Sequence, residues 1–199
     1  MNREPFNIVI LISGGGTNLQ ALINASSRSS FRISAVISNK SSAEGLDRAK
    51  RSGIDTFVIE HGSFDSRIAF EKCLAAKIKE IGPNLIVLAG FMRVLGSKFI
   101  NLFRGKIINI HPSLLPKYPG LNTHQRALEN KESIHGVTVH FVTDELDGGP
   151  IIAQDSVPVL SDDTTETLAA RVLEREHVIY PKVVEALAAG KIRVRNEDV

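Results

Sequence analysis

Residues 8–23 read IVILISGGGTNLQALI, and this stretch decides the fold class. The unbroken apolar run at residues 8–12 is typical of a strand that is buried on both faces of a sheet. Three glycines, residues 14–16, then lead into a helix. A buried strand that turns directly into a helix is the opening unit of an α/β domain.

Apolar runs bounded by turn residues alternate with helical patterns along the rest of the chain. We expect buried parallel strands at residues 8–12, 33–37, 56–59, 85–89 and 107–110, and half-exposed or antiparallel strands at residues 137–142 and 151–157. The sequence therefore predicts an α/β fold with an open, mostly parallel mixed sheet and helices on both faces.

Two helices have clear boundary signals. The first is expected to begin at Asp65 as its N-cap and to end at Gly82. The second is expected to begin at Asp163, with Glu166 three residues later. The only cysteine, Cys73, falls within the first helix, where we expect it to pack as a small apolar side chain.

Composition excludes several classes of protein. The 199 residues are 43% hydrophobic and 23% charged, values that are ordinary for one globular domain. The 24 Lys and Arg residues nearly balance 22 Asp and Glu residues, which argues against binding of long nucleic acid through its phosphates. A single cysteine favours a reducing compartment, and no apolar run approaches the roughly 20 residues that span a bilayer. We expect a cytoplasmic protein that binds neither nucleic acid nor membrane.

The glycine loop after the first strand predicts an anion site. Backbone N–H groups and the helix dipole converge at such a turn, and Thr17 and Asn18 add side-chain donors. A dinucleotide site would need glycine in place of Leu19 and an acidic residue about 20 residues further on, but residues 31–40 contain no acid. A single phosphate monoester fits better than NAD, and a tight turn without a ligand is the alternative.

Asn109 and His111 end the fifth expected strand. Residues two apart on a strand point to the same side, and open α/β sheets bind ligands at the carboxyl ends of their strands. An amide donor beside an imidazole suits a reaction in which a carbonyl oxygen gains negative charge, as in acyl transfer. A structural histidine is the competing interpretation.

Asp147 lies in the turn-rich segment TDELDGGP, residues 143–150. If it lies against His111, its carboxylate would favour the charged imidazolium and keep a proton available for donation. An Asp in a turn is otherwise structural. The chain has no G-x-S-x-G, H-E-x-x-H or paired-cysteine motif, so we expect direct transfer without a metal.

Six segments together resemble the signature blocks of the phosphoribosylglycinamide formyltransferase family, and they cover nearly the whole chain: ISGGGTN, FDSR, LAGFMRVL, NIHPSLLPKYPG, HFVTDELDGGPII and EREHVIYP. The resemblance implies a Rossmann-like formyltransferase fold. It also implies transfer of the formyl group of 10-formyltetrahydrofolate to the amine of glycinamide ribonucleotide, in purine biosynthesis. The glycine loop departs from the bacterial pattern, reading GGGTN where GNGSN is expected, but it keeps the backbone donors.

The resemblance assigns roles to individual residues. Asn109 and His111 would stabilise the oxyanion, and Asp147 would support His111. The ribonucleotide would bind at Gly16, Thr17, Asn18 and Glu176. The reduced folate would bind at Arg67, Met92, Arg93, Val94, Leu95 and Asn109. Without the resemblance, the alternatives are a solvated first-turn residue for Arg67, a loop surface charge for Arg93 and a helix-face acid with an ion partner for Glu176.

We expect a single formyltransferase domain over residues 1–199, acting as a monomer or a homodimer. Its nucleotide-binding half would be residues 1–105, and its folate-binding and catalytic half would be residues 106–199. Three alternatives stay open: a methionyl-tRNA formyltransferase, expected to need a further C-terminal domain, a formyltetrahydrofolate hydrolase, expected to carry an N-terminal regulatory domain, and a noncatalytic nucleotide- or folate-binding module.

Overall fold

The structure, a computed structural model, describes residues 5–192. One seven-stranded sheet has the order β3-β2-β1-β4-β5-β6-β7. Its strands are β1 (Phe6–Ile12), β2 (Phe31–Ser38), β3 (Thr56–Val58), β4 (Leu85–Leu88), β5 (Ile107–His111), β6 (Ile134–Phe141) and β7 (Ile151–Pro158). The helices are α1 (Thr17–Ser26), α2 (Gly45–Arg51), α3 (Arg67–Ile81), α4 (Ser97–Leu102), α5 (Thr123–Glu129) and α6 (Thr165–Ala188), with a short 3₁₀ helix at His61–Ser63.

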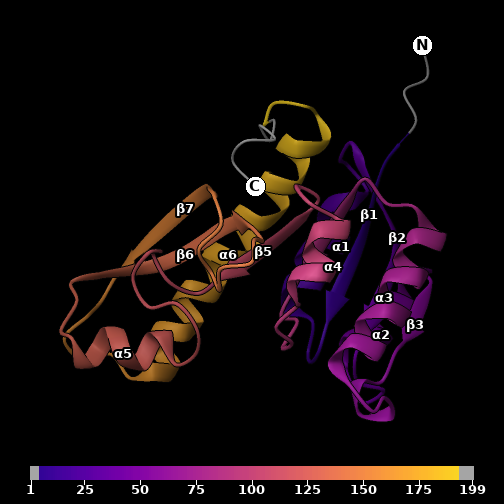
Figure 1. Ribbon diagram of the computed structural model, residues 1–199. Coiled ribbons are helices and arrows are strands. Elements are labelled where there is room, and N and C mark those ends of the chain that lie inside the picture. Colours follow the sequence, from indigo (N-terminus) through magenta and orange to yellow (C-terminus); the bar gives the residue numbers. More distant parts are fainter. Residues whose placement is uncertain (1–4, 193–199) are drawn as a thin grey trace.

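Strand direction divides the sheet into two parts. Strands β1 to β5 pair in parallel, whereas β6 pairs antiparallel with β5 and β7 antiparallel with β6. In Figure 1 the antiparallel strands extend away from the parallel ones, and α5 lies beneath them. The predicted α/β fold with an open, mostly parallel mixed sheet is confirmed.

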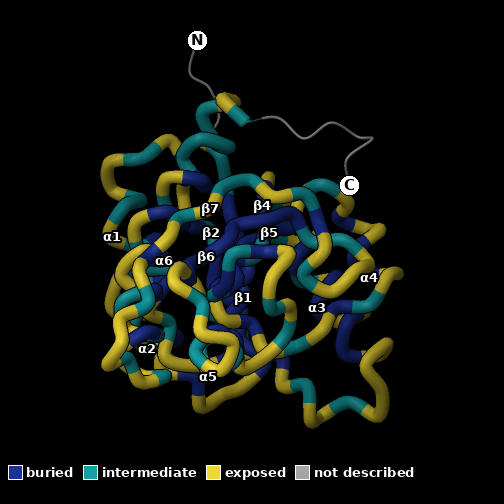
Figure 2. The backbone as a smooth tube through the Cα atoms, turned by 90° about the vertical axis from the view of Figure 1, so that its left-hand side faces the viewer, coloured by how far each residue is buried: buried dark blue, intermediate teal, exposed yellow. Residues whose placement is uncertain are grey.

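Helices cover both faces of the parallel part. Ile8, Ile10 and Ile12 of β1 pack with side chains of α1, α2 and α6 on one face. Val9 and Leu11 pack with α3 and α4 on the other face. Figure 2 shows the strands as the buried centre of the molecule, with exposed segments around them. This two-sided burial is why residues 8–12 read as a continuous apolar run.

The loops after β1 and β4 meet at the carboxyl edge of the sheet. The backbone N–H of Ser13 donates to the carbonyl of Gly90 at 3.1 Å, and the N–H of Met92 donates to Ser13 Oγ at 2.7 Å. The strand order reverses here, because β1 has β2 on one side and β4 on the other. Open α/β sheets bind ligands at such a point.

Two predictions about helix α3 are wrong: the identity of its N-cap residue and the burial of Cys73. Its N-cap is Ser66 and not Asp65, because Ser66 has the extended backbone of a cap and its Oγ accepts the backbone N–H three residues on at 3.2 Å. Cys73 is exposed and not packed, because Leu74 and Ile78 form the buried face of the helix and Cys73 lies off that face.

Helix α6 also begins one residue later than expected. Thr164 is its N-cap and forms a capping box with Thr167. Asp163 does not cap the helix, because its carboxylate pairs with Arg171, whose Nη1 lies 2.6 Å from Asp163 Oδ2. The ion pair with Arg171 therefore leaves Thr164, and not Asp163, as the residue that caps the helix.

The glycine loop offers a test of local backbone strain. Gly16 has a φ of 71°, and a Cβ there would lie 2.8 Å from the Cα of Gly45. Gly16→Ala should lower the free energy of unfolding by about 1 to 3 kcal/mol in urea denaturation. Nothing lies within 4 Å of a Cβ at Gly15, so Gly15→Ala should stay within about 0.5 kcal/mol of the unaltered protein. Equal losses in the two variants would contradict this account.

Candidate active site

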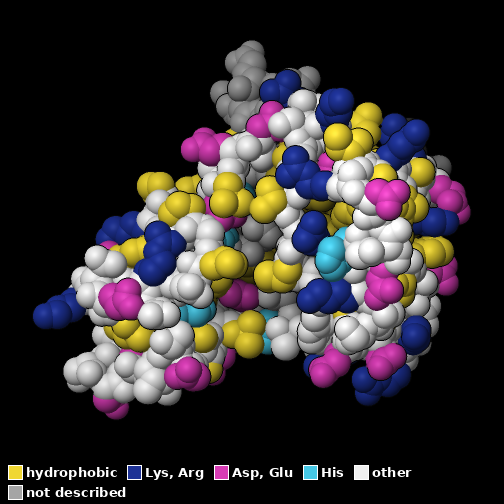
Figure 3. Space-filling view, turned by 60° about the horizontal axis from the view of Figure 1, so that its bottom comes forward, with side chains coloured by type: hydrophobic (Ala, Val, Ile, Leu, Met, Phe, Trp, Pro, Cys, Tyr) yellow, Lys and Arg dark blue, Asp and Glu magenta, His cyan; other side chains and the backbone are white. Residues whose placement is uncertain are grey.

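Asn109, His111 and Asp147, called here the central trio, meet beside β5. Asn109 and His111 lie on β5, and Asp147 reaches them from the loop between β6 and β7. His111 Nδ1 lies 3.5 Å from Asp147 Oδ2, and His111 is 5% exposed. Figure 3 shows a hollow with histidine and acidic side chains between two lobes of the surface. The structure thus brings together three residues that the sequence separates by up to 38 positions.

The β6–β7 loop holds Asp147 in a defined position. Asp147 has a φ of 53°, and its Oδ2 accepts the backbone N–H of Gly120 at 2.8 Å. A Cβ at Gly149 would collide with the carbonyl oxygen of Phe141, while the Phe141 N–H donates to the carbonyl of Pro150 at 2.9 Å. The second glycine of the turn therefore lets the loop lie directly against the end of β6.

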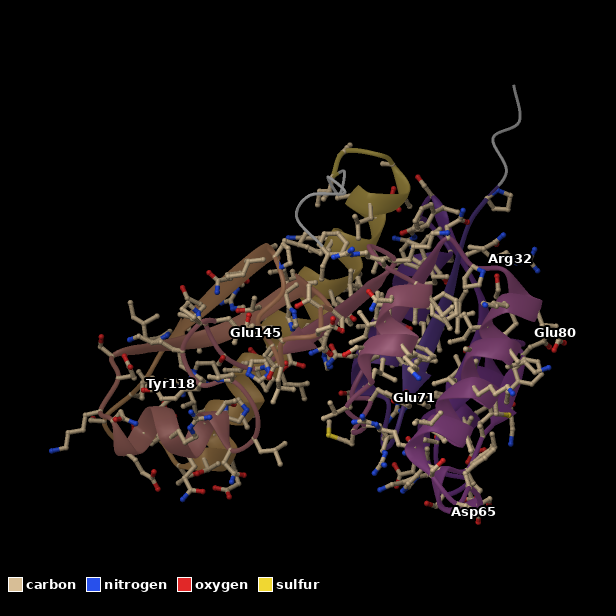
Figure 4. All side chains as sticks on the ribbon, viewed as in Figure 1. Arg32, Asp65, Glu71, Glu80, Tyr118 and Glu145 are labelled. Carbon is tan, nitrogen blue, oxygen red and sulfur yellow. The ribbon has the colours of Figure 1, made fainter. Side chains whose placement is uncertain are left out.

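The two ring nitrogens of His111 have different neighbours. Nε2 lies 2.8 Å from the carbonyl oxygen of Tyr118, which belongs to the loop between β5 and α5 (Figure 4). A carbonyl oxygen can only accept a hydrogen bond, so Nε2 carries a hydrogen. Nδ1 faces Asp147 and is the ring nitrogen left for a ligand.

A buried histidine that the sequence analysis missed faces Asn109. His140 Nε2 lies 3.3 Å from Asn109 Nδ2 and 3.8 Å from Asp147 Oδ1. Burial lowers the pKa of His140, although its contact with the Phe141 carbonyl and the charge of Asp147 oppose this shift. The available signal was a histidine inside an apolar strand just before the DGGP turn.

Two further histidines lie near the loop that follows β5. His124 Nδ1 lies 3.2 Å from His135 Nε2. Burial is the main cause that lowers the pKa of His135 to about 4, and the neighbouring His124 lowers it further. Burial also lowers the pKa of His124. The ring of His135 is therefore neutral at neutral pH, and it packs edge-on against Tyr118 of that loop.

The glycine loop leaves the N-terminus of α1 free for an anion. Gly16 is the N-cap residue in the left-handed conformation, and no side chain in the described structure caps this helix. Arg48 Nε stabilises the loop by donating a hydrogen bond to the carbonyl of Gly15 at 2.7 Å. Thr17 is exposed at the same point. Uncapped backbone N–H groups at a helix N-terminus are a general type of anion site.

Glu176 and Asn18 form a buried pair beside this loop. Asn18 Nδ2 donates to Glu176 Oε2 at 2.6 Å, and Glu176 is 8% exposed. Burial raises the pKa of Glu176, and the bond from Asn18 partly offsets this. Within residues 5–192, Asn18 Oδ1 has no hydrogen-bond partner. The pair thus presents acceptors, which suit a ligand with N–H donors.

Arg67 is tied to the loop after β4 through Glu71. Arg67 Nε lies 3.6 Å from Glu71 Oε1, and Glu71 accepts the backbone N–H of Gly96 at 2.8 Å. Figure 4 shows Glu71 on the side of α3 that faces the centre of the molecule. A cavity of about 630 Å³ between α3 and α4 is lined by Arg67 and Gly96 but by no member of the central trio.

The loop segment expected to contact folate has mixed exposure. Met92 is 65% exposed and Val94 is 62% exposed, so both side chains are accessible to a ligand. Arg93 is half-buried. Leu95 is buried in the core with α3 and α4, so only its backbone is available.

Comparison with known proteins assigns the chain to a family. A family model described as formyl transferase matches residues 6–184. The chain belongs to the formyl transferase family. It is 50% identical to the phosphoribosylglycinamide formyltransferase of Escherichia coli (strain K12) over 190 residues, which cover 94% of this chain and 90% of that protein.

Two further proteins are similar to this formyl transferase over nearly its whole length. The phosphoribosylglycinamide formyltransferase structure from Coxiella burnetii superposes with a TM-score of 0.93 at 53% identity, covering 96% of this chain and 91% of that one. The human trifunctional purine biosynthetic protein adenosine-3 is 44% identical over 194 residues, which are 96% of this chain and 19% of that protein.

Residues 5–192 of this formyl transferase contain neither a cluster of metal-binding side chains nor a membrane-spanning helix. No group of three His, Cys, Asp or Glu side chains in this range is placed to hold a metal ion. No helix in the same range is long and apolar enough to cross a membrane.

The residues expected to bind the two ligands of this formyl transferase do not follow the predicted division of the chain at residue 105. Arg67 and residues 92–95, expected at the folate site, precede residue 105. Glu176, expected at the ribonucleotide site, follows it and contacts Asn18 of the first half. The division into a nucleotide-binding half and a folate-binding half stays a prediction.

The raised pKa of Glu176 predicts a pH-dependent stability. The folded chain binds the carboxyl proton of Glu176 more tightly than the unfolded chain does. The stability that the protonated carboxyl contributes is therefore present below the ordinary pKa of 4.5, and it is lost as the pH rises through the folded pKa. Glu176→Gln should therefore raise the thermal midpoint by a few degrees at about pH 8, but not at about pH 4, in ligand-free protein.

Thermal melts across this pH range measure the effect. Glu174 is exposed on the same helix, so Glu174→Gln is the matched control and should keep the original pH dependence. The same pH dependence in Glu176→Gln as in the unaltered protein would contradict the assignment.

Proposed function

We propose that this chain transfers the formyl group of 10-formyltetrahydrofolate to the amine of glycinamide ribonucleotide, giving formylglycinamide ribonucleotide and tetrahydrofolate in purine biosynthesis. The observation that carries the proposal is the 50% identity to the E. coli phosphoribosylglycinamide formyltransferase over nearly the whole of both chains. The 10-formyltetrahydrofolate is the co-substrate that the family uses. The central trio supplies the chemistry that formyl transfer needs.

The reaction requires stabilisation of charge on one oxygen. The amine nitrogen attacks the formyl carbon, and the formyl oxygen becomes negatively charged. The bond from that carbon to N10 of the folate then breaks, and the proton lost by the amine passes to N10. Asn109 Nδ2 would donate a hydrogen bond to the oxygen, and so would His111 Nδ1 when the ring carries a hydrogen on both nitrogens. The carboxylate of Asp147 lies beside His111. Loss of one such donor typically costs about 100 to 1,000-fold in rate.

The two substrates would approach the trio from different loops. The phosphate of the ribonucleotide would bind the free backbone N–H groups at Gly16 and Thr17, and its glycinamide end would donate to Glu176 and Asn18 Oδ1. The folate would bind along Arg67, Met92, Arg93, Val94, Leu95 and Asn109. Ser13 joins the two loops, which supports adjacent pockets.

The catalytic unit would be one chain, as a monomer or within a homodimer, and would act in the cytoplasm. One chain is supported as the catalytic unit because the residues named for the site all lie on one continuous sheet, its helices and the loops that connect them.

The activity is tested by varying the acceptor. Release of tetrahydrofolate from 10-formyltetrahydrofolate should depend on glycinamide ribonucleotide, and should be negligible with water alone or with charged methionyl-tRNA. His111→Ala is expected to slow the ribonucleotide reaction by about 100 to 10,000-fold, with little change in ribonucleotide affinity by calorimetry. Turnover that does not require the ribonucleotide would contradict the proposal, and a variant that lost affinity instead would make His111 a binding residue.

A further inference from the structure

The side chain that faces Asn109 across the sheet is His140. Antiparallel pairing places Asn109 of β5 directly opposite His140 of β6. Opposite residues of an antiparallel pair are close enough for their side chains to interact, and here Asn109 Nδ2 lies 3.3 Å from His140 Nε2. His140 is 2% exposed, so water does not compete for this contact.

The surroundings of His140 determine which ring nitrogen carries the hydrogen. Nδ1 lies 2.9 Å from the carbonyl oxygen of Phe141. That oxygen can only accept, so Nδ1 is the protonated nitrogen. Burial keeps the ring neutral by lowering its pKa, and Nε2 is therefore an unprotonated acceptor. The 3.8 Å approach of Nε2 to Asp147 Oδ1 is then not an ion pair.

An unprotonated Nε2 selects one of the two orientations of the Asn109 amide. With Nδ2 toward His140, one N–H of the amide is donated to the imidazole and the second is left for a ligand. In the opposite orientation the amide oxygen would face the lone pair of Nε2, and two acceptors would meet in a buried place. The amide would also direct its oxygen, and not an N–H, toward a ligand.

We propose that His140 is a positioning residue that orients the amide of Asn109, so that its second N–H points at the formyl oxygen on which charge develops. This inference rests on the proposed function for its catalytic consequence. The orientation itself depends only on contacts among residues of the chain, and it can be tested separately.

The tautomer of His140 is the first test. Nitrogen-15 NMR of histidine-labelled, unaltered protein at neutral pH should show His140 as the Nδ1–H tautomer. Either the Nε2–H tautomer or the imidazolium would overturn the inference. This measurement needs no variant and no substrate. It therefore tests the orientation of Asn109 even if the acceptor of the formyl group is not the ribonucleotide.

The second test compares two replacements of His140 of similar size. Glutamine can place an acceptor oxygen near the position of Nε2, whereas methionine cannot accept well there. His140→Met should lower kcat by about 10 to 100-fold. This loss is smaller than the loss of about 100 to 1,000-fold in kcat that follows removal of an oxyanion donor. His140→Gln should retain kcat within about threefold, and the KM for the ribonucleotide should change little in both variants.

A double-mutant cycle with Asn109 separates positioning from general loosening of β6. In an Asn109→Ala background, His140→Met should change kcat by less than about threefold, because the amide it orients is gone. Val139 is the matched control: it is fully buried on the same strand, and Val139→Ala should have the same small effect on kcat in both backgrounds.

The outcomes of the cycle are distinct. An equal loss from His140→Met in both backgrounds would overturn the positioning role and leave His140 as a structural residue. An unchanged kcat in Asn109→Ala alone would instead overturn the role proposed for Asn109 in catalysis, whatever the tautomer of His140.

Discussion

The antiparallel pairing of β6 with β5 is the constraint on which the whole site depends. It places His140 opposite Asn109, and it brings the chain to the start of a loop that folds back over β5. That loop carries Asp147 to within 3.5 Å of His111, where the backbone of Gly120 also holds it. The site therefore lies where the parallel part of the sheet ends: Asn109 and His111 are on β5, His140 is on β6, and Asp147 is on the loop that follows β6.

A single hydroxyl joins the two loops that would hold the substrates. Ser13 follows β1, and its Oγ donates to Asn39 Oδ1 at 2.5 Å while it accepts the N–H of Met92 at 2.7 Å. The glycine loop begins at the next residue, and the segment expected to bind folate begins at Met92. A phosphate site and a folate site built on these loops are adjacent without any movement of the sheet.

Local patterns predicted the strands because residues buried on two faces read as continuous apolar runs. They placed helix starts less well, since Ser66 and Asp65 are both good caps and the choice depends on backbone geometry. The two-residue spacing of Asn109 and His111 was sufficient to predict that they share a side. The contact of Asp147 came from family resemblance, and His140 was missed because strand register depends on the intervening residues 112–133.

The proposed arrangement of two pockets around the central trio can be seen in a crystal structure with both glycinamide ribonucleotide and a folate analogue that cannot release its one-carbon group. We expect phosphate oxygens about 3 Å from the backbone nitrogens at the start of α1, and the amine beside Glu176. We also expect the transferable carbon next to Asn109 Nδ2 and His111 Nδ1. A phosphate bound away from the glycine loop, or a folate whose reactive end lies away from β5, would contradict it.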